Sequence, residues 1–188
     1  MAIGQLVSDV QAGQPFTPNL KSILRSFDMC PLNKVKVVII NDHPYPEKGV
    51  ANGLAFACKI NPFIKELNDV TEDKFIDGPT PSLEYLPRNG VMLLNMAMTC
   101  PIGKPKDHIP MWEPVTATII KGINENTTDT IFVFVGEETQ PLAEMVTNAS
   151  HSKLFIPSFD EQTKWDSMDI FLRINKILVK KNKTCVDW

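Results

Sequence analysis

The residues whose types best fit chemistry lie in a short polar loop that follows an apolar run. Val35 to Ile40 is rich in β-branched residues, and the loop from Asn41 to Pro46 comes directly after it. Asp42 supplies a carboxylate, His43 an imidazole that can orient water near neutral pH, and Tyr45 an aromatic ring. A buried strand that ends in such a loop delivers functional groups to its carboxyl end, where open α/β sheets bind ligands. The sequence therefore predicts a ligand site at this loop.

Three further apolar runs predict the strands that position this loop. Val91 to Asn95 and Thr130 to Gly136 are strong candidates, and Lys153 to Ile156 is a weaker one. The near-continuous apolar character of the strong runs favours strands that are covered on both faces, as in a parallel sheet. Polar residues follow the first, second and fourth strands, so we expect those loops to converge on one rim of the sheet.

Helical patterns alternate with these strands. Apolar residues at helical spacing predict helices over 20–27, 59–70, 111–124, 140–146 and 168–179. Between Asp69 and Pro87 the chain is polar and rich in breakers, which predicts a surface excursion. The alternation predicts an α/β fold of three αβα layers, with a central, mostly parallel four-stranded sheet, in a single domain that spans residues 1–188.

Composition and charge exclude several classes of protein. With 43% hydrophobic and 22% charged residues, the 188-residue chain has enough apolar surface for a core, which excludes a disordered or fibrous protein. The formal net charge is -3, so contact with nucleic acid would need a local basic patch and not a global positive field. The densest basic stretch is expected at a solvated helix end; it comprises Lys176, Lys180, Lys181 and Lys183.

The cysteines and the hydropathy pattern concern metals, redox state and location. The four cysteines are widely spaced and form no C-x-x-C pair, which predicts reduced, mostly buried thiols and no metal site; they are Cys30, Cys58, Cys100 and Cys185. The chain has no run of about 18 apolar residues and no basic, apolar leader at its start. We therefore expect a cytoplasmic protein, or a nuclear or host-cell one if the source is eukaryotic or viral, with no membrane partner.

Several motifs occur in an order that matches a known family. Asn41 to Pro46 is in register with the motif Gly-Gln-Asp-Pro-Tyr-His and retains its Pro-Tyr pair. Gly49 to Phe56 matches Gly-x-x-x-Gly-Leu-x-Phe, and Lys65-Glu66-Leu67 matches a Lys-Glu-Leu helix. Gly90 to Asn95 matches an asparagine-bearing strand, and Phe132 to Gly136 a strand that ends in glycine. Over about residues 35–188 the chain thus resembles the family-1 uracil-DNA glycosylases, and the resemblance implies their fold.

The resemblance implies a pocket for a pyrimidine that is flipped out of the DNA stack. Phe56 would stack on the base. The amide of Asn95 would pair with the uracil edge, because an amide offers a donor and an acceptor in one plane. Tyr45 would stand against C5 of the ring and reject the methyl group of thymine.

The first catalytic position departs from the family pattern. His43 occupies the register of an aspartate that holds the attacking water, so the resemblance implies that His43 and the neighbouring Asp42 position water here. A protonated imidazole would oppose the cationic sugar of the transition state. Adjacent residues of an extended segment also point in opposite directions, so a role for Asp42 requires a shift of the loop backbone.

The second catalytic motif departs as well. It begins His-Pro-Ser in the family and reads Ile156-Pro157-Ser158 here, and isoleucine donates no hydrogen bond to a departing uracil. His151 would have to reach the site from upstream. Pro157, Ser158 and Phe159 are the expected DNA contacts. The wedge residue is left open within 159–162, where Phe159 is the apolar candidate.

These features predict a divergent uracil-DNA glycosylase-like protein that recognises an extrahelical pyrimidine and hydrolyses its N-glycosidic bond, leaving an abasic site without a metal or organic cofactor. Two alternatives stay open. One is a protein that keeps the fold without hydrolysis and acts in DNA binding or replication, or as a decoy in a virus or phage. The other is a glycosylase for a modified pyrimidine. The expected partner is single- or double-stranded DNA, with a replication protein as a further candidate, and we expect a monomer.

Overall fold

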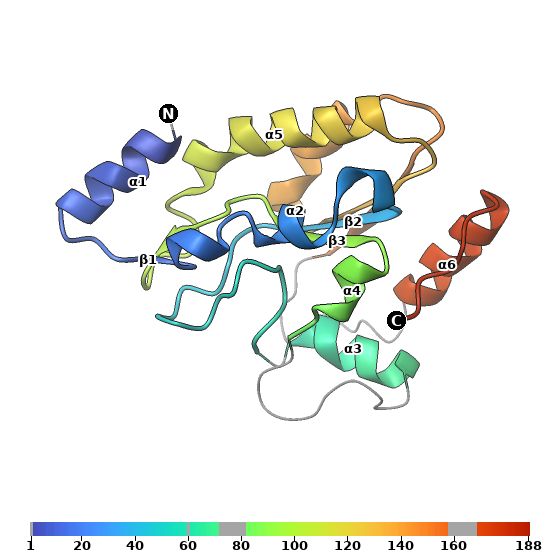
Figure 1. The fold of residues 1–188 in the computed structure, drawn as a ribbon, viewed down its shortest axis with the longest axis horizontal. Helices are drawn as coiled ribbons and strands as arrows, with labels where there is room; N and C mark the ends of the chain where they lie inside the picture. The colour runs from blue at the N-terminus through green and yellow to red at the C-terminus, as the bar shows by residue number, and fades with distance from the viewer. Residues whose placement is uncertain (1, 60, 72–81, 158–168) are drawn as a thin grey trace.

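A four-stranded parallel sheet forms the centre of the computed structural model (Figure 1), in which residues 2–59, 61–71, 82–157 and 169–188 are described. The strand order is β3-β2-β5-β6. The strands are β2 (Val37–Asn41), β3 (Val91–Asn95), β5 (Ile131–Val135) and β6 (Ser152–Ile156). These match the four predicted strands to within two residues at each end, and all their pairings are parallel.

The register of the sheet brings two asparagines together at its carboxyl edge. β2 pairs with β3 from Val37 opposite Val91 to Asn41 opposite Asn95. Every apolar residue of β2 is buried, because both faces of the strand are covered by helices. The polar side chain at the end of each strand therefore emerges at the same edge, as predicted for this rim.

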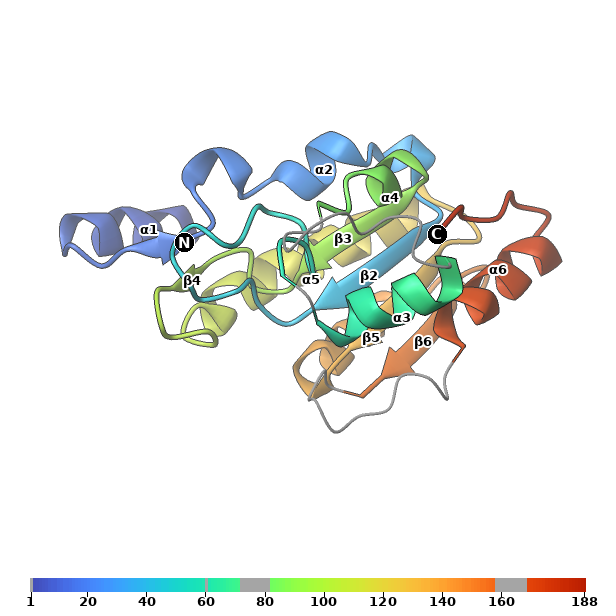
Figure 2. The ribbon, with the colours of Figure 1, turned by 90° about the horizontal axis from the view of Figure 1, so that it is seen from below.

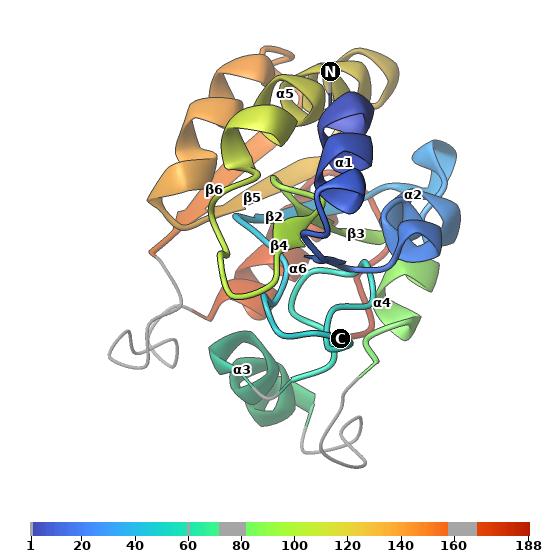
Figure 3. The same cartoon turned by 90° about the vertical axis from the view of Figure 1, so that its left-hand side faces the viewer.

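Helices cover both faces of the sheet, as the view along it shows (Figure 3). Val38 and Ile40 of β2 pack into the core under α1 (Ala2–Gln11), α5 (Ile109–Asn126) and the 3₁₀ helix η3 (Glu137–Met145). Val37 and Ile39 point to the opposite face, into the core under α3 (Pro62–Thr71), α4 (Tyr85–Arg88) and α6 (Ile170–Lys180) (Figure 2). Alternate residues of one strand thus serve two cores, which confirms the three-layer αβα prediction.

The predicted helix over 20–27 is wrong in extent. The chain forms two short pieces there, the 3₁₀ helix η1 (Leu20–Ser22) and α2 (Arg25–Met29), followed by the 3₁₀ helix η2 (Leu32–Lys34). Leu20 and Leu24 are exposed, so the apolar stripe that suggested one helix has no core to cover on that side.

Three other elements differ from expectation. The segment predicted as a helix over 140–146 is the 3₁₀ helix η3, with Pro141 inside it; proline lacks the N–H that an α-helix needs. The predicted surface excursion ends early, because Leu83 and Leu86 are buried in the core; its middle, 72–81, lies outside the described residues. A two-stranded antiparallel sheet, β1 (Phe16–Thr17) with β4 (Cys100–Pro101), was not predicted.

Candidate functional site

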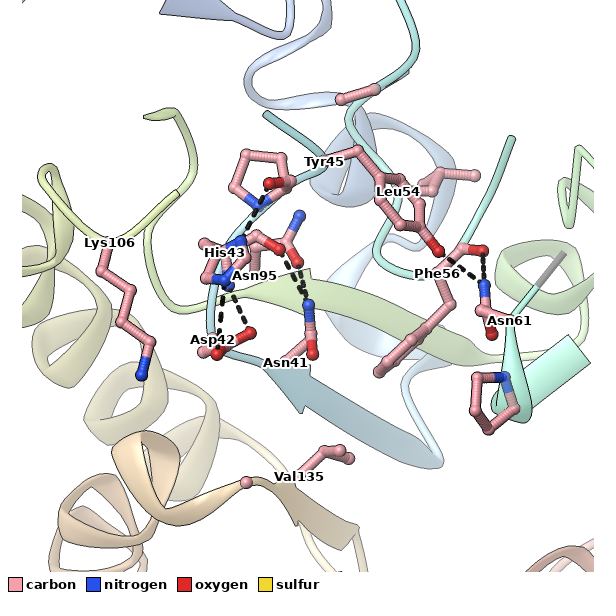
Figure 4. Close-up of a pocket in the computed structure, with 14 residues that line it drawn as sticks. Asn41, Asp42, His43, Tyr45, Leu54, Phe56, Asn61, Asn95, Lys106 and Val135 are labelled. Carbon is pink, nitrogen blue, oxygen red and sulfur yellow. Dashed lines mark hydrogen bonds and ion pairs between the residues drawn. The ribbon is translucent and has the colours of Figure 1, made fainter. Parts of the chain in front are cut away.

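A cavity of about 360 Å³ opens at the carboxyl edge of the sheet. Its wall is built from the loop after β2, the segment that leads into α3, and the ends of β3 and β5. All five cavity residues predicted from sequence line it, namely Asp42, His43, Tyr45, Phe56 and Asn95. Figure 4 shows Tyr45, Phe56 and Asn61 on one side of the cavity and Lys106 on the other. The cavity volume is large enough for a small planar ring and its nearest substituent.

Asp42 and His43 lie together on the cavity wall, although an extended backbone would separate them. β2 ends at Asn41 and the chain bends, so that the two side chains no longer alternate. Asp42 Oδ1 accepts the backbone N–H of His43 at 2.9 Å, and Asp42 Oδ2 lies 3.5 Å from His43 Nε2. His43 Nδ1 donates to the carbonyl of Pro44 at 3.0 Å, which assigns a proton to that nitrogen. A carboxylate and an imidazole nitrogen side by side can hold one water molecule between them.

Asn95 is held in one orientation by a neighbour that the sequence reasoning missed. Asn41 Nδ2 donates to Asn95 Oδ1 at 3.1 Å and to the carbonyl of His43 at 2.8 Å. The bond to Asn95 directly links the two strand ends, because Asn41 and Asn95 are register partners. The signal in the sequence was the polar residue that ends the first apolar run.

Phe56 presents an aromatic ring to the cavity from a strained backbone. Its ring stacks on Phe63 of α3, with centroids 4.5 Å apart and an interplanar angle of 13°. Its φ is +66°, in the left-handed region that costs a residue with a side chain about 1–2 kcal/mol. Gly53 allows the backbone of this segment to lie directly against the backbone at Ser22. A Cβ at Gly53 would lie 1.9 Å from the carbonyl oxygen of Ser22. Only glycine fits such a close backbone contact.

Tyr45 lies beside Phe56 and contacts both Asn61 and Lys59. Asn61 Nδ2 donates to the Tyr45 hydroxyl at 2.7 Å and to the carbonyl of Phe56 at 2.8 Å. Lys59 Nζ lies 5.5 Å from the centroid of the Tyr45 ring and pairs with Glu47. Burial raises the pKa of Tyr45 to about 12, outweighing the hydrogen bond from Asn61 that lowers it. The phenol is therefore neutral at physiological pH, and the wall that it forms carries no charge.

Lys106 brings a positive charge to the opposite wall. It comes from the loop between β4 and α5, and its Nζ lies 2.8 Å from Glu138 Oε1 at the start of η3. The hydrogen bond to Glu138 raises the pKa of Lys106, so the side chain is cationic at neutral pH. Nothing in the local sequence marks this lysine, because only the tertiary fold brings its loop to the cavity.

The predicted DNA-contact segment is only partly described. Pro157 is exposed after β6 and does not line the cavity, while Ser158 and Phe159 lie outside the described residues. Ile156 is 2% exposed and packs in the core, so this position supplies no donor to the cavity. His151 bonds to the backbone of Thr130 and Asn124 at the other end of the sheet and does not reach the site.

Two further observations bear on metals and membranes. Within the described ranges, no group of three or more His, Cys, Asp or Glu side chains is arranged to hold a metal ion. Among the helices that the structure describes, none has the length and apolar character needed to span a membrane.

Cys30 and Cys100 are buried thiols, as predicted, whereas Cys185 is exposed.

Curated uracil-DNA glycosylases are similar to this chain along nearly its whole length. Uracil-DNA glycosylase of Sinorhizobium medicae is 28% identical over 193 residues, covering 97% of this chain and 80% of its own length. The Streptococcus pyogenes enzyme of that name is 27% identical over 197 residues, covering 99% of this chain and 89% of its own. No protein-family model matches the chain.

Solved structures agree on the fold. Mimivirus uracil-DNA glycosylase superposes with a TM-score of 0.85 at 22% identity, covering 100% of this chain and 79% of the viral one. A mimivirus variant in complex with UGI gives 0.86 over 81% of its length. The protein from Nitratifractor salsuginis gives 0.63 at 16% identity. The chain is thus a homologue of the uracil-DNA glycosylases and has their three-layer fold.

Proposed function

We propose that this protein recognises an extrahelical uracil in DNA and hydrolyses its N-glycosidic bond, releasing the free base and leaving an abasic site. The observation that carries the proposal is the convergence of Tyr45, Phe56 and Asn95 on one cavity, in a chain similar over nearly its whole length to uracil-DNA glycosylases. DNA is the proposed partner, and the reaction belongs to base-excision repair.

In this proposal three side chains recognise the base. Phe56 stacks on the pyrimidine ring, with Phe63 supporting it from behind. Asn95 accepts a hydrogen bond from N3–H and donates one to O4, in the orientation that Asn41 fixes. Tyr45 faces C5, where its neutral ring leaves room for hydrogen and none for a methyl group.

Asp42 and His43 take the hydrolytic role. As the bond between C1′ and the base breaks, the electron pair leaves with the base and positive charge develops on the sugar. A water held between the Asp42 carboxylate and His43 adds its oxygen to C1′, and its proton passes to this pair. Lys106 offers a cation to a phosphate that flanks the flipped nucleotide.

The test is incubation of the pure protein with single-stranded DNA that carries one uracil, followed by alkali to cleave abasic sites. We expect strand cleavage at the uracil position alone, and none with thymine or cytosine there. Asn95→Ala should abolish it, while His43→Asp, which restores a carboxylate in the family's register, should increase it. Absence of product at stoichiometric protein would contradict the hydrolytic claim.

A second candidate function is recognition without hydrolysis. The observation that favours it is Ile156, which is buried in the core and provides no hydrogen-bond donor to a departing uracil anion. Binding to uracil-containing DNA that exceeds binding to the thymine-containing control, without cleavage in the alkali assay, would establish this function in place of the first.

A further inference from the structure

One polar side chain, Asn61, ties together two walls of the cavity. Its amide nitrogen lies within hydrogen-bond distance of three oxygens: the Tyr45 hydroxyl at 2.7 Å, the Phe56 carbonyl at 2.8 Å and the Lys59 carbonyl at 2.9 Å. Its amide oxygen accepts the backbone N–H of Ile64 at 3.1 Å, as the N-cap of α3. With both ends engaged, the side chain is fixed relative to the helix.

We propose that Asn61 is a positioning residue that sets how closely Tyr45 approaches a bound pyrimidine, and so decides which substituent at C5 the cavity accepts. The inference rests on the proposed function, because it takes Tyr45 as the wall that faces C5. Asn61 needs no contact with the base; it acts through Tyr45 and Phe56.

The position of the Tyr45 ring is set by side-chain contacts, because the backbone beside it is fixed. Pro44 and Pro46 fix the backbone on either side of the tyrosine, and its ring lies under the ammonium of Lys59. Lys59 is half-exposed and pairs with Glu47 at the surface, so this contact does not attach Tyr45 to a helix or strand. Asn61, anchored on α3, supplies the contact that joins the phenol to a rigid element.

Asn61 also contacts Phe56, the residue proposed to stack on the base. Phe56 has a φ of +66°, and Asn61 holds its carbonyl in that unfavourable conformation. Because the same amide nitrogen reaches the Tyr45 hydroxyl, one side chain links the backbone that carries the stacking ring to the wall that would face C5. A misfit of one methyl group in an apolar pocket changes affinity by about 10- to 200-fold, so a small displacement of Tyr45 is enough to alter selectivity.

The substitution that isolates this role is Asn61→Ser. A serine hydroxyl keeps an acceptor for the α3 N-cap but is too short to reach the Tyr45 hydroxyl. Asn61→Ala removes both functions. Asn124→Ser is the matched control, because Asn124 makes a similar set of bonds, to the backbone N–H groups of Thr147 and Asn148, far from the cavity.

Two readouts separate positioning from overall function. The chain has two tyrosines, so a protein labelled with fluorotyrosine gives one ¹⁹F signal for Tyr45 and one for Tyr85, assigned with Tyr85→Phe. Selectivity is measured as the ratio of affinities for single strands that contain 2′-fluoro-2′-deoxyuridine or its 5-methyl counterpart. The 2′-fluorine disfavours a sugar cation and so keeps the base attached.

We expect Asn61→Ser to shift the Tyr45 signal and to lower the preference for the unmethylated base about tenfold, whereas Asn124→Ser changes neither. An unmoved Tyr45 signal, or an unchanged preference when the signal moves, overturns the proposal. If the wild-type protein shows no preference at all, the proposed function itself is contradicted, and the ¹⁹F signal alone decides whether Asn61 positions Tyr45.

Discussion

At the scale of single residues, the bond from Asn41 to Asn95 orients the group that would read the pyrimidine edge. Asn41→Ala removes the donor at 3.1 Å while leaving the strand pairing intact. A net hydrogen bond contributes about 0.5–1.5 kcal/mol, so we predict roughly 2- to 13-fold weaker binding of a single strand with one uracil, measured by fluorescence anisotropy. Asn95→Ala should weaken it further. Unaltered affinity in Asn41→Ala would show that Asn95 is oriented by something else.

Lys106 makes a separate electrostatic prediction. If it neutralises one phosphate, Lys106→Gln should reduce the slope of log affinity against log salt by about 0.7 for single-stranded DNA. Glu138→Gln removes its ion-pair partner and should strengthen binding at low salt. Lys180→Gln is the control, because Lys180 is exposed at the end of the sheet opposite to the cavity. It ends α6, and the neighbouring Lys181 bonds to the carbonyl of Ser150 just before β6 begins. Equal slopes for Lys106→Gln and Lys180→Gln would contradict a phosphate contact by Lys106.

At the scale of elements, a buried polar chain fastens α1 to the core. Trp112 Nε1 donates to Thr99 Oγ1 at 2.7 Å, Thr99 lies 2.9 Å from His108 Nδ1, and His108 Nε2 lies 3.1 Å from Asp9 Oδ2. The Thr99 hydroxyl, which accepts from the indole, donates to Nδ1, so Nε2 carries the proton that Asp9 accepts. Asp9, His108 and Thr99 are all buried. This series of hydrogen bonds therefore has a structural role, despite its likeness to a catalytic triad.

We predict that His108→Ala lowers the free energy of unfolding by about 3–5 kcal/mol, because it leaves the buried Asp9 carboxylate without its charge-assisted partner. Gln5→Ala removes a more exposed donor to the same carboxylate, and should cost only about 0.5–1.5 kcal/mol. Urea denaturation measures both. Hydrogen exchange should also show early loss of protection in α1 for His108→Ala; protection equal to wild type there would contradict the fastening role.

The loop that carries Phe56 gives a paired prediction on glycines. Gly53→Ala should destabilise the protein by about 3 kcal/mol or more, since its Cβ would overlap the Ser22 carbonyl and its φ is +91°. Gly49→Ala shares the positive φ but meets nothing within 4 Å, so about 1 kcal/mol is expected. Equal destabilisation of the two variants in urea would mean that the close approach at Gly53 relaxes at little cost.

At the scale of the whole molecule, the sequence predicted the elements whose burial is continuous. β2, β3 and β5 are covered on both faces, so their apolar runs and polar ends mark both strand and rim. α1 was missed because the contact that stabilises it, Asp9 with His108, joins residues 99 positions apart. Of the missed cavity residues, Asn61 carried a recognisable N-cap signal before Pro62, whereas Lys106 carried none.

The central claim, that one cavity at the carboxyl edge of the sheet takes a flipped uracil, is tested most directly by a crystal structure. The complex would contain a single strand with one 2′-fluoro-2′-deoxyuridine, which keeps its base attached. We predict the base stacked on Phe56, its N3 and O4 paired with Asn95, its C5 against Tyr45, and C1′ facing Asp42 and His43. A base bound elsewhere, or DNA bound with the cavity unfilled, would contradict the account.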